Sequence, residues 1–455
     1  MQDAVRDVAI VGGGPAGLAA AWRLRDRDVV LLEQEQRLGG RLKSEPRGQY
    51  WMNFGGHLFP SAGSNMHALL TELGLEVIEI PGLKTALSFG GKVYHSKSIE
   101  TYPFLLRASL RERFDLARVG LKLKYMVWRW YRYTRPRPGE APSAQRARVE
   151  QFRARETFRD LLGRPSKRID QIFQTAAHRA SADAEQQSAG CAVALFGAVW
   201  SGKKDNTSLN MKGGSGQFGV AMQRALGDRV QLGATVRRVI GDDDGVTVTY
   251  EQGGTEQSLR ARYAIVCLPA TLAREVVADI PIEVDQALSL VHYGSWVGMS
   301  MITDEKGPMP YDDIYALTAS DRTFDMFFNH ANPLRNGTRQ PGGSLMCYAG
   351  GSTAESLMSR SDEEITALYC KELYELFPQL EGHIVESRIQ RWVIGGSYRR
   401  VTSDFFEPLV EYSATPEKRV RFAGDYFAPL GQMEVAVTTG QDAADLVRQD
   451  LSHRF

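Results

Sequence analysis

The chain has 455 residues, of which 43% are hydrophobic and 24% charged, so its composition is globular and excludes disordered, collagen-like and fibrous proteins. Its 55 Lys and Arg balance 54 Asp and Glu, and a net charge of +1 gives no argument for nucleic-acid binding. The charge is unevenly spread, because residues 107–168 hold 18 Lys and Arg against 6 Asp and Glu, leaving +12 there and −11 elsewhere.

Four cysteines lie far apart, with no CxxC pair and no metal-like spacing to histidines. We therefore expect free thiols, no metal site and a reducing compartment, the cytoplasm. The N-terminus lacks the basic and apolar regions of a signal peptide. The longest charge-free apolar stretch, residues 186–202, falls short of the ~20 residues that span a bilayer, so we expect no transmembrane helix.

The chain opens with the pattern of a βαβ unit. Residues 8–11 are apolar and β-branched, residues 15–25 space their apolar side chains as a helix does, and residues 29–32 are apolar again. Residues 64–80 then predict an amphipathic helix that leads into a strand. The sequence thus begins as an α/β protein.

Helical and strand patterns follow in blocks. Residues 102–135 and 150–190 predict helices, separated by an exposed loop at 136–145. We see no internal repeat. The later predictions are a helix at 213–226, strands at 230–240, 245–250 and 263–268, an antiparallel sheet within 292–350, a helix at 361–377, a strand at 420–424 and a helix at 434–450.

A glycine-rich turn joins the first strand to the first helix. Gly12, Gly14 and Gly17 have the spacing GxGxxG, with Pro15 and Ala16 between the last two. Gly12 permits the tight turn, Gly14 lets the backbone approach a pyrophosphate, and Gly17 lets the helix pack on the strand. The helix N-terminus offers free N–H groups to phosphates. The turn predicts a dinucleotide site, the alternative being a turn without a ligand.

Glu33 ends the second strand, 21 residues after Gly12. A carboxylate at this place accepts hydrogen bonds from ribose hydroxyls and repels a 2′-phosphate. Glu33 and its neighbour Gln34 are therefore predicted cofactor contacts, and NADP is disfavoured. The alternative for Glu33 is an exposed carboxylate without a ligand.

The stretch from Glu33 to Ser44 resembles the ExxxRxGGRxxS signature of the flavin amine oxidase superfamily, which includes protoporphyrinogen oxidases and carotenoid desaturases. The resemblance implies FAD rather than NAD, with Gly40 and Arg41 beside the pyrophosphate. A guanidinium suits this place because it makes bidentate, charge-assisted contacts to phosphate oxygens. The alternative for Arg41 is a solvated surface arginine.

More stretches of the same resemblance are spread over the chain. Residues 54–57 are similar to the family segment beside the flavin ring, residues 235–239 to its returning strand, and residues 391–398 to its Trp and Gly-x-Tyr element. Residues 421–436 are similar to its second FAD fingerprint. The further cofactor-binding residues that the resemblance implies are Gly55, Gly56, Val236, Trp392, Gly424, Asp425, Gln432, Met433 and Val435.

The resemblance also implies the fold. We expect an α/β protein in which a Rossmann-like FAD-binding domain of the GR2 type is interleaved with an α+β substrate domain. The predicted FAD-binding parts are residues 1–80, 208–280 and 415–455. The predicted substrate-domain parts are residues 81–207, which include a helical insertion, and residues 281–414, which include a mixed sheet.

Two departures from the family limit what can be said of the substrate. Many of its amine oxidases carry a lysine that holds a water at flavin N5, in a strand reading Gly-Ser-x-x-Lys, and here the last position is Gly298. Monoamine oxidases flank the amine with two aromatic rings, of which Tyr398 supplies one while Gln432 replaces the other. Tyr398, Gln432 and His57 are the substrate-facing candidates, with a structural role as the alternative for each. No catalytic base is assigned.

Residues 104–135 interleave Arg and Lys with Leu, Phe, Tyr and Trp. Such a composition is compatible with an interfacial helix whose cations reach lipid headgroups, and the resemblance places a membrane-facing insertion in this part of the chain. The alternatives are a lid over the substrate cavity or a subunit contact. Membrane association and a homodimer both stay open.

The leading hypothesis is an FAD-dependent oxidoreductase that moves a hydride from a C–N or C–C bond of a small molecule to flavin N5, with O2 as electron acceptor. One alternative is a non-redox flavoenzyme resembling UDP-galactopyranose mutases. Another is a flavin-less escort protein on the same fold. Gln432-Met433-Glu434 favours the oxidases, and the intact Glu33 and Arg41 argue against the escort protein.

Overall fold

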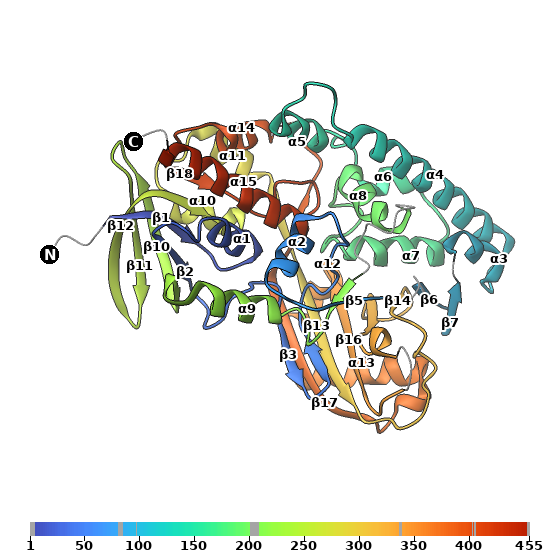
Figure 1. Ribbon diagram of the computed structural model, residues 1–455. Coiled ribbons are helices and arrows are strands. Elements are labelled where there is room, and N and C mark those ends of the chain that lie inside the picture. Colours follow the sequence, from blue (N-terminus) through green and yellow to red (C-terminus); the bar gives the residue numbers. More distant parts are fainter. Residues whose placement is uncertain are drawn as a thin grey trace.

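The computed structural model describes two large sheets with helices around them (Figure 1). The domain boundaries stay predictions, and those at 80/81 and 207/208 touch residues outside the described part. The described residues are 5–80, 85–96, 98–200, 209–335, 339–402, 404 and 406–452.

The first sheet has a parallel centre, in which β1 pairs with β2 on one side and β12 on the other. Val8 and Ile10 of β1 enter one core while Ala9 and Val11 enter a second, so the sheet is buried on both faces, as parallel sheets usually are. The strands are β1 (Arg6–Val11), β2 (Val29–Glu33), β9 (Val230–Leu232), β10 (Ala234–Gly241), β11 (Val246–Gln252), β12 (Thr255–Val266) and β18 (Val420–Phe422).

Helices cover both faces of this sheet, and the first and last α-helices of the described chain, α1 and α15, pack against each other (Figure 1). The predicted βαβ opening and C-terminal helix are therefore present. One face carries α1 (Pro15–Arg23), α2 (Asn65–Glu72), α9 (Gln217–Leu226) and α15 (Met433–Ser452). The other face carries α10 (Ala270–Val276), α11 (Ile282–Ser289) and α14 (Glu407–Ala414).

The second sheet is antiparallel except where β14 runs parallel to β6, which confirms the antiparallel sheet expected within 292–350. Its longest strand, β17, has 16 residues and was anticipated only as a motif. The strand order is β17 (Ile384–Arg399), β13 (Val291–Thr303), β16 (Gly343–Gly350), β15 (Met326–Asn329), β14 (Ala316–Ala319), β6 (Thr85–Phe89) and β7 (Lys92–Ser96). Helices α12 (Gly351–Leu357) and α13 (Asp362–Leu376) pack on one face.

Two antiparallel strand pairs, β3–β4 and β5–β8, and four short 3₁₀ turns complete the strands and turns that the structure describes. The pair β3–β4 precedes the segment at Phe54 and contacts β13 and β16 of the second sheet. These elements are β3 (Ser44–Arg47), β4 (Tyr50–Asn53), β5 (Val77–Glu79), β8 (Leu209–Met211), η1 (Ile99–Thr101), η2 (Gly227–Arg229), η3 (Asn332–Leu334) and η4 (Pro378–Leu380).

Six helices form the insertion at the upper right of Figure 1. The expected exposed loop at 136–145 is wrong at its end, because a helix begins at Pro142, and proline suits the first turn of a helix. Within the described part of the chain, no helix is long and apolar enough to cross a membrane. The six are α3 (Tyr102–Leu105), α4 (Leu110–Thr134), α5 (Pro142–Glu150), α6 (Phe158–Leu162), α7 (Lys167–His178) and α8 (Ala189–Trp200).

A buried histidine joins this insertion to the second sheet. The His178 ring lies 2.8 Å through Nδ1 from Asp325 Oδ1 and 2.7 Å through Nε2 from Asp183 Oδ1. Burial opposes protonation of His178, but the hydrogen bonds to the two carboxylates outweigh it and raise its pKa to about 9. The contact is therefore a charged clamp at neutral pH.

Candidate functional site

The glycine turn opens the N-terminus of α1 toward a cavity. Gly12 has φ +102°, a conformation that favours glycine, and a Cβ at Gly17 would overlap the Gly12 carbonyl oxygen. A Cβ at Gly14, in contrast, would meet nothing within 4 Å. The turn thus keeps the helix N-terminus bare, and its free N–H groups suit an anion.

Glu33 closes the turn from the next strand. Its Oε2 accepts a hydrogen bond from the Gly13 N–H at 2.7 Å, and its Oε1 accepts one from the Glu35 N–H at 2.8 Å. Burial raises the pKa of Glu33. The carboxylate therefore fixes the glycine turn itself, a role that reasoning from its spacing to Gly12 did not anticipate.

Arg41 and Asp425, 384 residues apart in sequence, form a bidentate ion pair. Arg41 Nη1 donates to Asp425 Oδ2 and Nη2 to Oδ1, each at 2.9 Å, and Nη1 also donates to the Gly395 carbonyl at 2.8 Å. The Ser397 hydroxyl donates to Asp425 Oδ2 at 3.2 Å. The pair thus joins the first third of the chain to β17 and the segment after β18.

These groups line one cavity of about 580 Å³, within the range of small-molecule and cofactor sites. The wall also includes residues that the sequence did not single out, among them Leu272 and Gln390. The predicted cofactor-binding residues in the wall are Gly12, Gly14, Pro15, Ala16, Glu33, Gln34, Gly40, Arg41, Val236, Trp392, Gly424 and Asp425.

The other predicted cofactor contacts, Gly17, Gly55, Gly56, Gln432, Met433 and Val435, are not part of this cavity wall. The segment at Gly55 and Gly56 lies close behind it, since the Gly56 N–H donates to the Arg41 carbonyl at 3.0 Å. The Trp392 indole N–H donates to the Phe54 carbonyl at 2.6 Å. This second contact joins residues 54–57, the segment predicted to lie beside the flavin ring, to β17.

The residues of this cavity fit FAD. A bare helix N-terminus with an open Gly14 suits a pyrophosphate, and the Glu33 carboxylate faces the same cavity. Asp425 is buried, lines the same cavity as Trp392 and carries two oxygens that can accept hydrogen bonds. Among the described residues, no group of His, Cys, Asp or Glu suits a metal ion.

Of the three substrate-facing candidates, Tyr398 lies beside the segment that leads to Gln432, because it forms a β-bridge with Leu430. The buried Tyr398 hydroxyl accepts from Arg400 Nε at 3.3 Å, and its ring packs with Cys191 and Leu430. Gln432 is exposed.

His57 is buried in a cluster of rings. Its Nδ1 lies 3.0 Å from the Gly55 carbonyl, so this nitrogen carries the proton. The Phe328 and His330 rings lie 4.5 and 4.6 Å away, centroid to centroid. Burial lowers the pKa of His57 to about 4, and the ring is neutral at pH 7.

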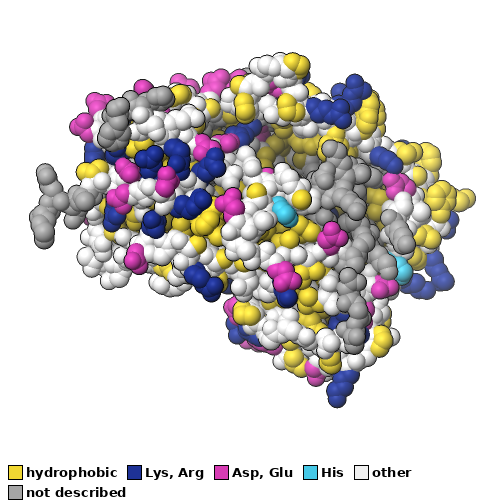
Figure 2. All heavy atoms as spheres, in the orientation of Figure 1, with side chains coloured by type: hydrophobic (Ala, Val, Ile, Leu, Met, Phe, Trp, Pro, Cys, Tyr) yellow, Lys and Arg dark blue, Asp and Glu magenta, His cyan; other side chains and the backbone are white. Residues whose placement is uncertain are grey.

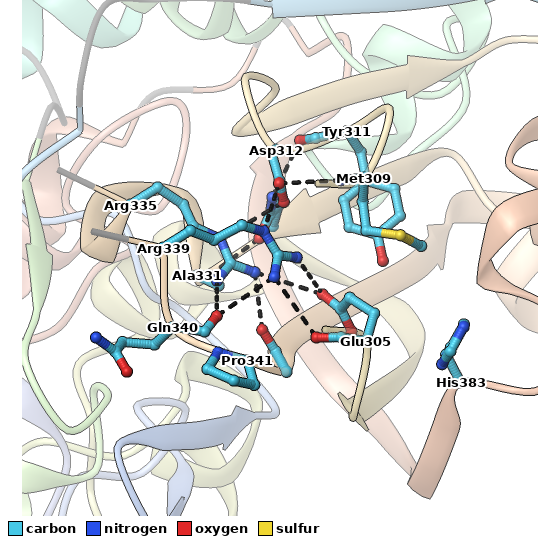
Figure 3. Close-up of polar contacts among 12 residues, drawn as sticks. Glu305, Met309, Tyr311, Asp312, Ala331, Arg335, Arg339, Gln340, Pro341 and His383 are labelled. Atoms are coloured by element: carbon cyan, nitrogen blue, oxygen red, sulfur yellow. Dashed lines mark hydrogen bonds and ion pairs between the residues drawn. The ribbon is translucent and has the colours of Figure 1, made fainter. Parts of the chain in front are cut away.

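A separate charged cluster closes two loops of the second sheet (Figure 3). Arg339 donates to Asp312 Oδ2 at 2.8 Å and to Glu305 Oε1 at 3.1 Å, while Arg335 Nη2 donates to the Gly342 carbonyl at 2.8 Å. Two arginines face two carboxylates here, so the charges are balanced within the chain. We assign this cluster to loop closure.

Comparison with known proteins places the chain among flavoenzymes. A model of flavin-containing amine oxidoreductases matches residues 15–448. An L-amino-acid oxidase from Crotalus adamanteus is 25% identical over 473 residues, covering 96% of this chain and 86% of the relative. L-amino acid oxidase Cdc18 from Crotalus durissus cumanensis is 24% identical, covering 96% of this chain and 89% of that protein.

Two solved structures share the fold. Cyclohexylamine oxidase from Brevibacterium oxydans superposes with a TM-score of 0.77 at 20% identity, covering 99% of this chain and 100% of that one. Putrescine oxidase bound to putrescine gives a TM-score of 0.76 at 21% identity, covering 98% and 99%. At such identities, the likeness shows the fold alone.

Proposed function

The chain belongs to the family of flavin-containing amine oxidoreductases and is an FAD-dependent oxidoreductase, and from this premise we propose that it oxidises the C–N bond of a small amine. The FAD prediction is confirmed by the family match. The choice of C–N over C–C is supported by the relatives, whose names are L-amino-acid, putrescine and cyclohexylamine oxidases.

The observation that carries the proposal is the cavity that joins the glycine turn to the Arg41–Asp425 pair. FAD, when bound, supplies the acceptor for the hydride. The N–H groups at the start of α1 would hold its pyrophosphate, and Glu33 would accept from ribose hydroxyls. Asp425, oriented by Arg41 and Ser397, would accept from hydroxyls nearer the ring.

We propose O2 as the electron acceptor, giving hydrogen peroxide, because the named relatives are oxidases. The test is anaerobic mixing of the purified yellow protein with putrescine, cyclohexylamine and an L-amino acid. Bleaching of the flavin by one amine, followed by recovery of colour and release of one peroxide per turnover on adding air, is the expected result. Bleaching by no amine, with turnover of a sugar nucleotide only after dithionite, would favour the mutase alternative.

For the surface of the molecule we propose contact with an anionic membrane through residues 104–135. The outer face of α4 presents an apolar stripe in which Leu110 is 86% and Trp128 52% exposed. The members are three, four or seven residues apart and so lie on one face. The stripe consists of Leu110, Phe114, Leu121, Tyr125 and Trp128, and Phe104 and Leu105 of α3 are also exposed.

Arginines extend this stripe at its C-terminal end. A hollow beside Trp128 is lined by Arg129, Arg132, Arg135 and Arg137, and no carboxylate belongs to its lining. The Arg132 guanidinium lies 4.7 Å from the centre of the Trp128 ring. Figure 2 shows hydrophobic and basic side chains side by side over this upper right part of the molecule.

An apolar stripe bordered by cations is the pattern of a helix that lies in the headgroup layer of a bilayer. The opposite face of α4, with Val119, Leu123, Met126 and Val127, is buried, so the helix lies flat on the protein. We propose a cytoplasmic location, and the four free thiols are the observation that supports it.

Vesicle flotation tests the membrane contact. The holoenzyme is expected to float with vesicles containing phosphatidylserine and to stay behind with neutral vesicles. Absence of flotation with either composition would overturn the membrane contact. A dimer that dissociates when Leu121 is changed to Ser would show that a second copy of the chain covers this face instead.

A further inference from the structure

Arg41 lines the cofactor cavity, and Lys43 lies two residues further along the chain. The two cations have different kinds of partner. Arg41 meets the Asp425 carboxylate in a bidentate pair. Lys43 Nζ donates instead to the neutral side chain of Gln390, at 2.7 Å from Oε1, and lies 5.4 Å from the centre of the Phe54 ring. No salt bridge joins Lys43 to a carboxylate among the described residues.

The partner of Lys43 belongs to the cavity wall. Gln390 and Trp392 both line the cavity, and they follow alternate positions of β17, so their side chains leave the same face of the strand. The Trp392 indole N–H donates to the carbonyl of Phe54. The Lys43 ammonium lies over the ring of the same Phe54. Lys43 is therefore one hydrogen bond away from the cavity, at its Trp392 end.

On the neighbouring strand β13, the residue opposite Gln390 is a glycine and has no side chain. In the pairing of β13 with β17, Gly298 lies directly opposite Gln390 and Trp296 lies opposite Trp392. Directly opposed residues project to the same face of a sheet. A cationic side chain at position 298 would thus reach the Gln390 side chain. In this chain the ammonium that contacts Gln390 belongs to Lys43, which directly precedes β3.

We propose that Lys43, acting through Gln390, supplies positive charge to the part of the cavity lined by Gln390 and Trp392 and favours the reduced, anionic flavin. The inference deepens the proposed function, because it assigns a positioning residue to the same site. The physical reason is that a fixed cation in a partly buried place stabilises negative charge that develops near it more strongly than water does. Burial lowers the pKa of Lys43, while Glu35 and Glu45 act in the opposite direction.

The experiment uses the FAD-loaded enzyme and sulfite, a small anion whose addition to oxidised flavin bleaches its absorbance and leaves negative charge on the ring. Lys43→Met is expected to weaken sulfite binding about tenfold, equivalent to about 1.4 kcal/mol, and Lys43→Arg to restore it to within about threefold. Lys212→Met, which removes an exposed lysine paired with Glu76, is the matched control.

A second variant keeps the inference testable if Lys43→Met folds poorly. Gln390→Glu preserves the size of the side chain and neutralises Lys43 in place, so it is expected to weaken sulfite binding by a similar factor. Unchanged sulfite affinity in both variants would overturn the role of Lys43. Because sulfite binding needs no amine, this outcome is separate from failure of the amine oxidation itself.

Discussion

The charged side chains of the cofactor cavity have partners within the chain, whereas the arginine-lined hollow on the outer face of α4 contains no carboxylate. In the cavity, Arg41 is matched by Asp425, and the Glu33 carboxylate accepts two backbone N–H groups. On α4, arginines line a hollow without a carboxylate, beside an exposed Trp128. Groups that are satisfied within the chain hold its structure together, whereas groups left open are available to something outside it. Substitutions should therefore cost stability in the first region and binding in the second.

The largest loss is expected from Asp425→Ala. The change leaves the Arg41 guanidinium without its carboxylate in a mostly buried place, and breaking such a pair costs about 3 kcal/mol. The free energy of unfolding should fall by that amount in urea titration, and the purified protein should retain little FAD. Asp445→Ala, which breaks an exposed pair with Arg23, is the control and should cost less than about 1 kcal/mol. Equal losses in the two variants would contradict the comparison.

The clamp at His178 extends the comparison to the boundary of the insertion. His178→Ala is expected to cost about 2 kcal/mol at pH 6. Because the folded-state pKa of His178 is raised from 6.5 to about 9, the stability gained from its protonation is complete below about pH 6.5 and is lost as pH rises through 9. Urea titrations at pH 6 and pH 9.5 should show the difference between the wild type and His178→Ala shrinking. A difference independent of pH would contradict a charged clamp.

Local patterns in the sequence predicted one side of this comparison well. The turn at Gly12 and the strand end at Glu33 are encoded by neighbouring residues, and the structure places both at the cavity. The Arg41–Asp425 pair and the Lys43–Gln390 contact join residues more than 340 positions apart in sequence. Local sequence patterns cannot predict such partners, because the contacts depend on how the folded chain positions β17 and the C-terminal segment beside residues 41–43.

The helical insertion was predicted only in outline, for the same physical reason. Its helices follow from periodicity, and the charge of residues 107–168 follows from counting. Which face of α4 is buried depends on α8 packing against it, and that contact leaves the Leu121 face outward. The start of α5 at Pro142 was missed because proline and polar residues mark both loops and helix starts.

A smaller loss is expected at Glu33, where one side chain has both a structural and a ligand-binding role. Glu33→Gln keeps the shape but replaces one acceptor oxygen by a donor, which should cost about 1 kcal/mol and weaken FAD retention about tenfold. Glu33→Ala should weaken retention further. Dialysis followed by the ratio of flavin to protein absorbance measures both. Full occupancy in Glu33→Ala would refute the assignment.

The smallest effect on stability is expected from substitutions on the exposed face of α4. These substitutions are the most direct test of the difference between the two regions. Phe114→Ser and Leu121→Ser remove exposed side chains, so the free energy of unfolding should change by less than about 0.5 kcal/mol while flotation with phosphatidylserine vesicles is lost. The control is Val119→Ser on the buried face of the same helix, which should cost about 2 kcal/mol and leave flotation intact. If the exposed variants instead destabilised the protein as Val119→Ser does, the stripe would be covered within the folded chain, and its exposure could not be the basis of membrane contact.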